Sequence, residues 1–302
     1  MFSHIPVMPK EVIKFLAPHA DENFIDATCG LGGHAQLILK KTKPNGQLLA
    51  IDQDTMALNE AQKNLADFHK RINWAHANFD ELGLLVRGWA AKEINGILFD
   101  LGVSTYQLTS SDRGFSFNLD ARLDMRMSPE TQRLNARDVV NSWDERAIKK
   151  ILKNYGQEPY AAKIAREIVR ERAILPIEKT NELVEIIKRA LPPSYRINRQ
   201  KHFATSTFRA LRMAVNDELQ VLESGLKQAL QVLSPGGPVS PSQGGRIVVI
   251  SFHSLEDRIV KNFFRDNENL KILTPKPIMA SEKEIQQNPK ARSAKLRAAI
   301  KK

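Results

Sequence analysis

The sequence predicts an α/β fold, a Rossmann-like doubly wound sheet of mostly parallel strands. Short apolar strands alternate with helical segments over the first hundred residues, which is typical of a parallel sheet covered on both faces. A glycine-rich turn, Cys29–His34, follows the first strand. Asp52 and Asp100 end two of the expected strands, at the sheet edge where folds of this class bind their ligands.

The strands are expected at about 24–29, 47–52, 73–77, 96–99 and 246–250. Helices are expected after the first two, from about His34 to Lys40 and after Asp54. A single long helix is predicted from Ser206 to Leu233, because leucine and valine recur along one side of it.

The alternation of strands and helices stops after Asp100 for more than a hundred residues. The segment 101–127 is loop-like, and 135–190 indicates several helices, of which 145–152 and 161–172 have cationic outer faces. We therefore expect a discontinuous sheet domain, 1–107 with 211–302, and a helical insertion over 108–210 that recognises the substrate. The Pro/Gly/Ser-rich stretch 234–245 predicts a mobile surface loop.

The glycine turn and the acids around it indicate a cofactor that contains adenosine. Gly30, Gly32 and Ala35 satisfy the dinucleotide pattern G-x-G-x-x-G/A, so NAD is one reading. Asp52, at the end of the second strand, suits the two ribose hydroxyls of either cofactor. Asp26 stands just before the glycines, where a carboxylate can meet the ammonium group of S-adenosylmethionine, a charge that NAD lacks.

Composition narrows the class of protein. The chain of 302 residues has no apolar run as long as a membrane span, no signal peptide and a single cysteine, so we expect a cytoplasmic protein without disulfides or a metal cluster. The net charge is +11, and the segment 122–212 holds 20 basic against 11 acidic residues. Six more basic residues lie in 290–302. This distribution favours a polyanionic partner such as nucleic acid.

Six segments in this order resemble the MraW/RsmH family of S-adenosylmethionine-dependent methyltransferases. They span most of the chain and read DATCGLGGH at 26–34, DLGVSTYQ at 100–107, RGFSF at 113–117, LDMRM at 123–127, SFHSLEDR at 251–258 and NPKARSAKLR at 288–297. The resemblance implies the class I methyltransferase fold. It also implies methylation of the exocyclic N4 of a cytosine in the decoding region of bacterial small-subunit (16S) ribosomal RNA, with S-adenosylmethionine as the methyl donor.

The resemblance also implies roles for individual residues in the cofactor pocket. Gly32, Gly33 and His34 would contact the methionine end of the donor. The ribose would bind to Asp52 and the adenine to Phe79, while Asp100 and Gln107 would complete the pocket. The chain departs from the family pattern PATRTFQALRI in the segment 203–213, where Ser206 replaces an arginine and Arg209 replaces a glutamine.

Methyl transfer to an amino nitrogen requires alignment of that nitrogen with the methyl group and an acceptor for its proton. Asp100 or Ser104 is expected to accept a hydrogen bond from the amino group, although Asp100 serving only the cofactor is an equal alternative. The run 251–257 either lines the pocket of the target base or simply caps a helix at Ser254.

RNA is expected to bind across the insertion and the basic C-terminal tail. The phosphate-binding candidates are Arg113, Arg122, Arg126 and Arg209. Phe115 and Phe117 either stack on bases or anchor the insertion. The expected substrate is small-subunit rRNA within an assembled 30S subunit, and a homodimer is left open. The competing classes are an NAD-dependent oxidoreductase and a non-enzymatic RNA-binding factor that keeps the fold as a scaffold.

Overall fold

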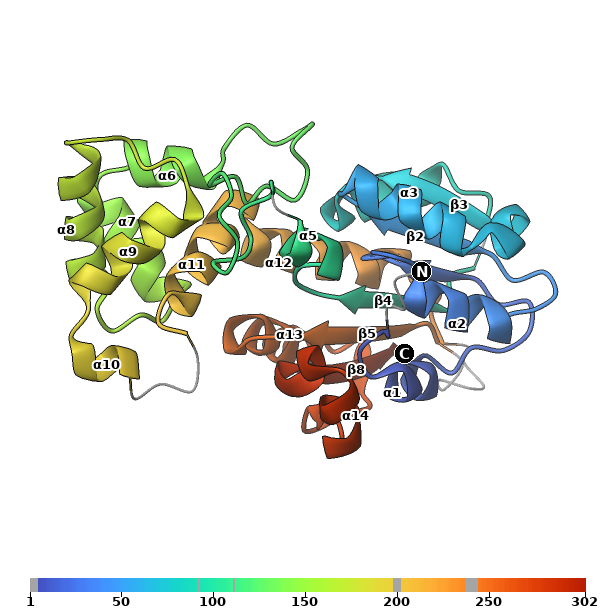
Figure 1. Cartoon of the computed structure of the whole chain (residues 1–302). Coiled ribbons are helices and arrows are strands. Elements are labelled where there is room, and N and C mark those ends of the chain that lie inside the picture. Colours follow the sequence, from blue (N-terminus) through green and yellow to red (C-terminus); the bar gives the residue numbers. More distant parts are fainter. Residues whose placement is uncertain (1–4, 92, 111, 198–201, 237–243) are drawn as a thin grey trace. The chain divides into compact units, whose positions relative to one another are not determined.

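A computed structural model describes residues 5–91, 93–110, 112–197, 202–236 and 244–302 (Figure 1). Within it the chain forms two compact units, Met1–Ser104 with Leu219–Lys302, and Thr105–Glu218. We refer to them as the sheet unit and the helical unit. The expected domain boundaries, at 107/108 and 210/211, lie a few residues from these. Most of the predicted loop at 234–245 is outside the described residues.

The sheet unit contains an eight-stranded sheet in the order β3-β2-β1-β4-β5-β8-β6, with β7 paired to β8. Strands β1 to β5 are parallel to one another, whereas β8 runs antiparallel to its neighbours. The strands are β1 (Phe24–Asp26), β2 (Leu48–Asp52), β3 (Ile72–His76), β4 (Gly96–Asp100), β5 (Arg246–Ser251), β6 (Leu270–Ile272), β7 (Ile278–Met279) and β8 (Lys295–Lys301). The predicted parallel α/β sheet is thereby confirmed.

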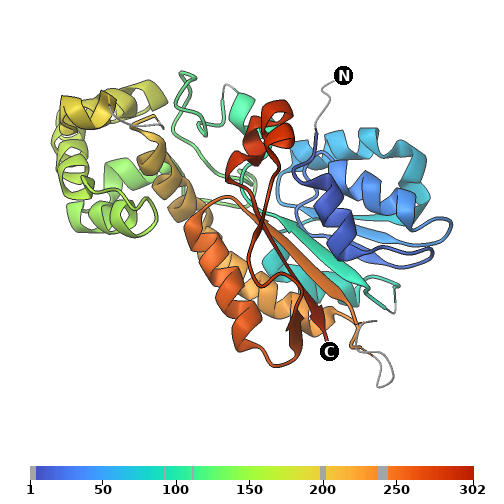
Figure 2. The same cartoon turned by 90° about the horizontal axis from the view of Figure 1, so that it is seen from below.

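Helices cover both faces of the sheet, because its central strands are apolar on both sides. In β5, Val248 and Ile250 face one core, which includes residues of α1 (Pro9–Leu16), α2 (Gly33–Lys41) and α3 (Thr55–Asn64). Ile247 and Val249 face the other core, which α4 (Leu82–Arg87), α12 (Glu218–Val232) and α13 (Ser254–Asp266) cover (Figure 2). This two-sided burial fixes the register of the strands and brings their carboxyl ends to one edge.

The basic C-terminal tail is a strand inside the sheet, not a free arm for RNA. Residues 296–300 of β8 are buried between β5 and β6. Arg297 is ion-paired with Asp257 of α13 at 2.6 Å, and the Lys301 ammonium donates to the carbonyls of Leu230 and Leu233. The expectation that the whole tail contacts RNA is therefore wrong for these cations, which hold the strand to its neighbours. Lys290, Arg292 and Lys302 of the tail are exposed.

The helical unit consists of helices and long loops. Its helices are α5 (Thr105–Thr109), α6 (Ala136–Ser142), α7 (Glu145–Asn154), α8 (Ala161–Arg172), α9 (Thr180–Ala190), α10 (Pro193–Ile197) and α11 (Thr205–Asn216). Asn135 and Asp144 cap α6 and α7 through their side chains. Apolar residues of α7, α8 and α9, among them Ile148, Ile164 and Ile187, are fully buried.

The prediction of one helix from Ser206 to Leu233 is wrong. Two helices, α11 and α12, are separated by Asp217, which has a left-handed backbone with φ 46°. The backbone N–H of Asp217 donates to the carbonyl of Met213 and so closes α11. Because aspartate tolerates this conformation better than most residues, it provides a helix end without glycine.

Candidate active site

A glycine turn opens helix α2 directly after β1. Gly30 and Gly32 have left-handed backbones, with φ 54° and 85°. A Cβ atom at Gly32 would also lie 2.7 Å from the Leu65 side chain, so only glycine fits there. Gly32 is the N-cap of α2 and supplies no side chain to its first turn. Backbone N–H groups at such a helix start are available to a polar or anionic ligand group.

Three carboxyl groups end the strands beside this turn: Asp26 on β1, Asp52 on β2 and Asp100 on β4. The strand ends at Asp52 and Asp100 are as predicted, whereas β1 ends at Asp26 and not at about residue 29. Asp52 accepts hydrogen bonds from the backbone of Gly30, at 2.7 Å, and of Asp54, at 2.9 Å. Asp26 is 1% exposed, and within the described part of the chain it accepts only the Thr28 N–H, at 3.3 Å, through Oδ1. The Thr28 hydroxyl accepts the Asp100 N–H at 2.6 Å, which ties the turn to β4.

Burial raises the pKa of two of these acids, Asp26 and Asp52. The pKa of Asp26 is raised to about 7, mainly by desolvation; His34 and the Thr28 N–H oppose the rise, and Asp100 and Asp52 add to it. Desolvation likewise raises the pKa of Asp52 to about 6, against its backbone hydrogen bonds. A cation placed among the three carboxyl groups would relieve this penalty. Burial, assisted by Asp26 and Asp52, also raises the pKa of the Cys29 thiol well above its ordinary value, which fits a packing role.

Unsatisfied polar atoms gather at the same place. The His34 ring, on the first turn of α2, is buried, and its Nε2 lies 3.6 Å from Asp100 Oδ2. Among the described residues, neither ring nitrogen of His34 has a hydrogen-bond partner, nor does Asp26 Oδ2 or Asp100 Oδ1. Buried polar atoms rarely remain unpaired, so this cluster fits a ligand that supplies hydrogen bonds and positive charge. We call the glycine turn, His34 and the three acids the donor site.

Phe79 lies after β3 and is half-buried. Its ring packs edge-on against Phe99, with centroids 5.4 Å apart and planes at 86°. A Cβ atom at Gly225 of α12 would lie 2.5 Å from the Phe79 ring, so this glycine makes room for it. Stacking of Phe79 on adenine stays a prediction. So do the roles of Ser104, at the end of the loop after β4, and of Gln107, which is buried in the helical unit.

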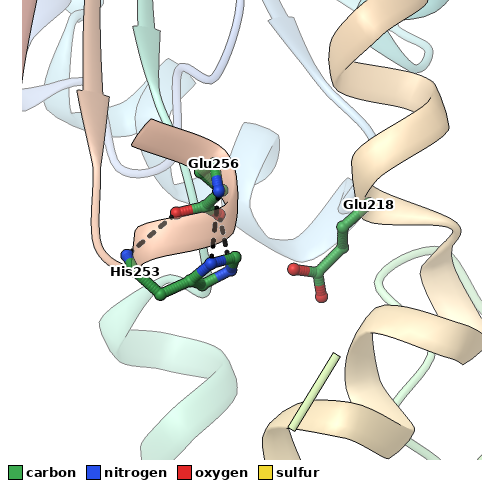
Figure 3. A group of neighbouring side chains, drawn as sticks. All are labelled: Glu218, His253 and Glu256. Carbon is green, nitrogen blue, oxygen red and sulfur yellow. Dashed lines mark hydrogen bonds and ion pairs between the residues drawn. The ribbon is translucent and has the colours of Figure 1, made fainter. Parts of the chain in front are cut away.

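The segment after β5 contains a buried pair, His253 and Glu256 (Figure 3). The two side chains approach at 3.2 Å, and Glu256 Oε2 accepts the backbone N–H groups of Phe252 and His253. His253 Nδ1 accepts the Glu256 N–H, so His253 and Glu256 form a capping box at the start of α13. The predicted cap at Ser254 is therefore wrong, because the cap is the residue before it. The third side chain drawn, Glu218, pairs with Arg212 at 2.7 Å.

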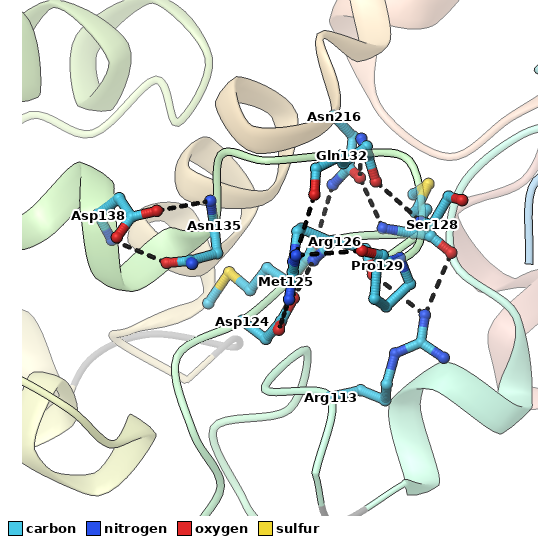
Figure 4. A network of polar contacts seen from close by, with 11 residues as sticks. Arg113, Asp124, Met125, Arg126, Ser128, Pro129, Gln132, Asn135, Asp138 and Asn216 are labelled. Atoms are coloured by element: carbon cyan, nitrogen blue, oxygen red, sulfur yellow. Dashed lines mark hydrogen bonds and ion pairs between the residues drawn. The ribbon is translucent and has the colours of Figure 1, made fainter.

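Two of the predicted RNA-binding arginines are bound inside the helical unit (Figure 4). Arg113 is buried and donates to the carbonyls of Arg126 and Met127. Arg126 forms a two-pronged pair with Asp124 and donates to the carbonyls of Pro129 and Gln132. These contacts fold the loop onto itself, so both guanidiniums have a structural role. Their contact with RNA stays a prediction.

The other two arginines differ from each other. Arg209 donates to the carbonyl of Gly156 at 2.6 Å, whereas Arg122 is exposed. Phe115 is buried, and Phe117 stacks on His202 with centroids 4.5 Å apart. This favours the reading of both rings as anchors of the insertion.

Sequence reasoning missed Asn216 at the end of α11. Its amide is buried, accepts the Met127 N–H at 2.8 Å and donates to the carbonyl of Met125 at 2.8 Å. Asn216 thus fixes the loop that contains Arg126. In the sequence, the only sign of this role is an isolated asparagine on an apolar helix.

Among the described residues, no helix is long and apolar enough to cross a membrane.

A parallel Rossmann-like sheet with an antiparallel strand beside β5, and a donor site of acids around a glycine turn, define the class I methyltransferases. The chain belongs to the MraW methylase family, whose sequence model matches residues 1–302. The resemblance noted in the sequence is thereby confirmed, and the NAD-dependent oxidoreductase and the scaffold readings are set aside. The methyl donor of this protein is S-adenosylmethionine.

Curated relatives match over almost their whole length. A protein of Trichormus variabilis named ribosomal RNA small subunit methyltransferase H is 47% identical over 100% of this chain and 92% of its own length. One of Thermosipho melanesiensis with the same name is 47% identical over 98% of this chain and 97% of its own. A third, from Geobacter sulfurreducens, is 46% identical over 99% of both chains.

The donor site fits S-adenosylmethionine, which carries an ammonium and a sulfonium. Asp26 Oδ2 and Asp100 Oδ1 are buried carboxyl oxygens without a hydrogen-bond partner among the described residues. They suit positive charge, as the raised pKa of Asp26 also does. NAD has no ammonium group to place there. The residues present therefore match the donor that the family requires.

Proposed function

We propose that this protein transfers the methyl group of S-adenosylmethionine to the exocyclic N4 of a cytosine in the decoding region of 16S ribosomal RNA. This choice of substrate is supported by the match to relatives named ribosomal RNA small subunit methyltransferase H, which extends along almost the full length of both chains. The resemblance of the six sequence segments supports the finer assignment to N4 and to the decoding region. We further propose the assembled 30S subunit as the form of the substrate.

We assign the binding of the donor to the residues of the sheet unit. Asp26 would hold the ammonium, Asp52 the ribose hydroxyls and Phe79 the adenine. The first turn of α2, from Gly33, would provide N–H groups for the carboxylate. Because the glycine turn and the strand ends are fixed by backbone hydrogen bonds to β2 and β4, these groups need no rearrangement to bind.

When bound, S-adenosylmethionine supplies a methyl group on a positively charged sulfur. The cytosine N4 would form a bond to the methyl carbon as the carbon–sulfur bond breaks, which would leave neutral sulfur and a positively charged nitrogen. That nitrogen would then release one proton to water. We propose that Asp100 orients the amino group through a hydrogen bond to its free oxygen, Oδ1. Ser104, in the loop after β4, would hold the second N–H. A base in a duplex cannot reach such a site, so the cytosine must be unpaired or flipped out.

The first test is transfer of labelled methyl groups to 30S subunits that lack the modification, followed by nucleoside analysis. We expect the label in N4-methylcytidine, and less transfer to protein-free 16S rRNA. Label in another nucleoside would contradict the N4 assignment. No label, with cofactor binding intact, would contradict the rRNA substrate.

The Asp100→Asn variant tests the role of the carboxylate. We expect the rate of transfer to fall by about 10²-fold or more, because the amide presents a different set of hydrogen-bonding groups to the amino group. Asp266→Asn is the matched control, since Asp266 is an exposed acid at the end of α13. A rate of Asp100→Asn equal to that of the control would remove Asp100 from the chemical step.

A further inference from the structure

Helix α7 of the helical unit carries a row of four exposed cations: Arg146, Lys149, Lys150 and Lys153. At 3.6 residues per turn these positions fall within about 100° of one another. The buried side chains of α7, Ile148, Ile151 and Leu152, lie on the opposite side. The row therefore faces solvent over about 10 Å of helix, given 1.5 Å per residue. We call it the α7 cation row.

None of the four cations makes an ion pair or side-chain hydrogen bond with any other described residue. They also stand at i,i+3 and i,i+4 spacings from one another, where like charges repel and weaken a helix. A surface that served only solubility would mix charges of both signs. The α7 cation row thus lowers the stability of the helix through charge repulsion, and no ion pair or side-chain hydrogen bond within the described residues offsets this loss.

Helix α9 of the same unit shows the opposite arrangement. Its exposed cations Lys188 and Arg189 are paired, Lys188 with Glu185 at 3.0 Å and Arg189 with Glu171 at 2.7 Å. The excess positive charge of this region is therefore not spread evenly over the unit. It is concentrated where no carboxylate neutralises it, which is the arrangement that attracts a polyanion.

We propose that the α7 cation row is a docking surface for the phosphate backbone of ribosomal RNA. This inference rests on the proposed function. It adds a surface that binds parts of the RNA other than the reacting base. The four side chains would contact phosphates without reading sequence, and so set the orientation of the RNA on the enzyme. Lysine and arginine on one helix face suit this role because their flexible stems follow the irregular backbone of a folded RNA.

The test is the double variant Lys149→Gln/Lys150→Gln, measured by binding to 30S subunits at several salt concentrations. We expect about tenfold weaker binding near physiological salt and a log–log salt slope shallower by about 1.5, because two phosphate contacts are lost. The matched control is Lys188→Gln/Arg189→Gln, which removes the same charge from α9. It should change binding by less than about threefold. Lys149→Arg/Lys150→Arg should bind as the wild type does.

Equal losses in the α7 and α9 variants would overturn the proposal, because the effect would then follow net charge and not the α7 cation row. Wild-type binding by the α7 variant would overturn it as well. S-adenosylmethionine affinity and circular dichroism, expected to be unchanged in every variant, verify that the chain folds. The proposed function fails separately, if the wild-type protein methylates no rRNA.

Discussion

The protonation state of Asp26 should make donor binding depend on pH. Its carboxyl group is buried, so the free protein holds a proton there below a pKa of about 7, whereas an unfolded chain would release it near 3.8. Between about pH 4 and 7 the unfolded chain has lost this proton and the folded chain keeps it, so the free energy of unfolding falls as the pH rises through this range. A bound ammonium reverses this penalty, because the carboxylate then has a partner.

We expect S-adenosylmethionine to bind about tenfold more weakly at pH 6 than at pH 8, because the donor requires ionised Asp26. Asp52, with a pKa of about 6, adds about a factor of two at pH 6. Titration calorimetry at several pH values measures the combined effect of Asp26 and Asp52 on the affinity for S-adenosylmethionine. The rise in melting temperature caused by the donor should likewise be larger at pH 8.

Asp26→Asn is the control for this pH dependence. The amide cannot ionise, so the donor should bind more weakly at pH 8 and with a nearly flat profile between pH 6 and 8. If the variant retained the wild-type profile, another group would be responsible for it.

The turn between β1 and α2 depends on a residue without a side chain at position 32. Gly32→Ala would place a methyl group 2.7 Å from Leu65 on a backbone with φ 85°. We expect it to lower the free energy of unfolding by about 1–3 kcal/mol and to weaken donor binding. Gly88→Ala is the comparison, since its Cβ would meet ordinary contacts at 3.6 Å. Chemical denaturation should show little change in that variant.

The strand β8 depends on a buried ion pair. Arg297 is almost inaccessible and pairs with Asp257, which Lys295 approaches at 3.6 Å. Arg297→Ala leaves a carboxylate in a site with little solvent, so we expect a loss of about 3 kcal/mol in the free energy of unfolding. Arg292→Ala, at an exposed position, should cost less than about 0.5 kcal/mol. Equal stability of the two variants would contradict the structural role of Arg297.

These elements also show which parts of the fold the sequence patterns predict and which they do not. Strands β1 to β5 are predictable because a strand buried on both faces is a continuous apolar run, and the donor site follows from the acids at their ends. Strand β8 escapes prediction because lysine and arginine interrupt it, and only the tertiary partner Asp257 makes Arg297 an interior residue. The end of α11 at Asp217 is not predicted, because leucines recur at helical spacing on both sides of this residue.

At the scale of the whole molecule, the sites that we propose for the methyl donor and for the RNA differ in their electrostatics. In the proposed donor site of the sheet unit Asp26 is buried and Asp52 and Asp100 are partly buried, so salt in the solvent screens their charges less than exposed charges. Most of the excess positive charge lies in the segment 122–212, which has 20 basic and 11 acidic residues and belongs entirely to the helical unit. Exposed cations act on RNA through displacement of its counterions, which depends steeply on salt.

We therefore expect opposite responses when the salt concentration rises from about 50 to 200 mM. Binding to 30S subunits should weaken by about 10²-fold or more, since several phosphate contacts are involved. The affinity for S-adenosylmethionine should change by less than about twofold, because buried pairs are weakly screened. Filter binding and calorimetry on the same preparation measure the two. Parallel weakening of both would show that the donor site is open to solvent, and a flat response of both would exclude phosphate contacts as the main source of RNA affinity.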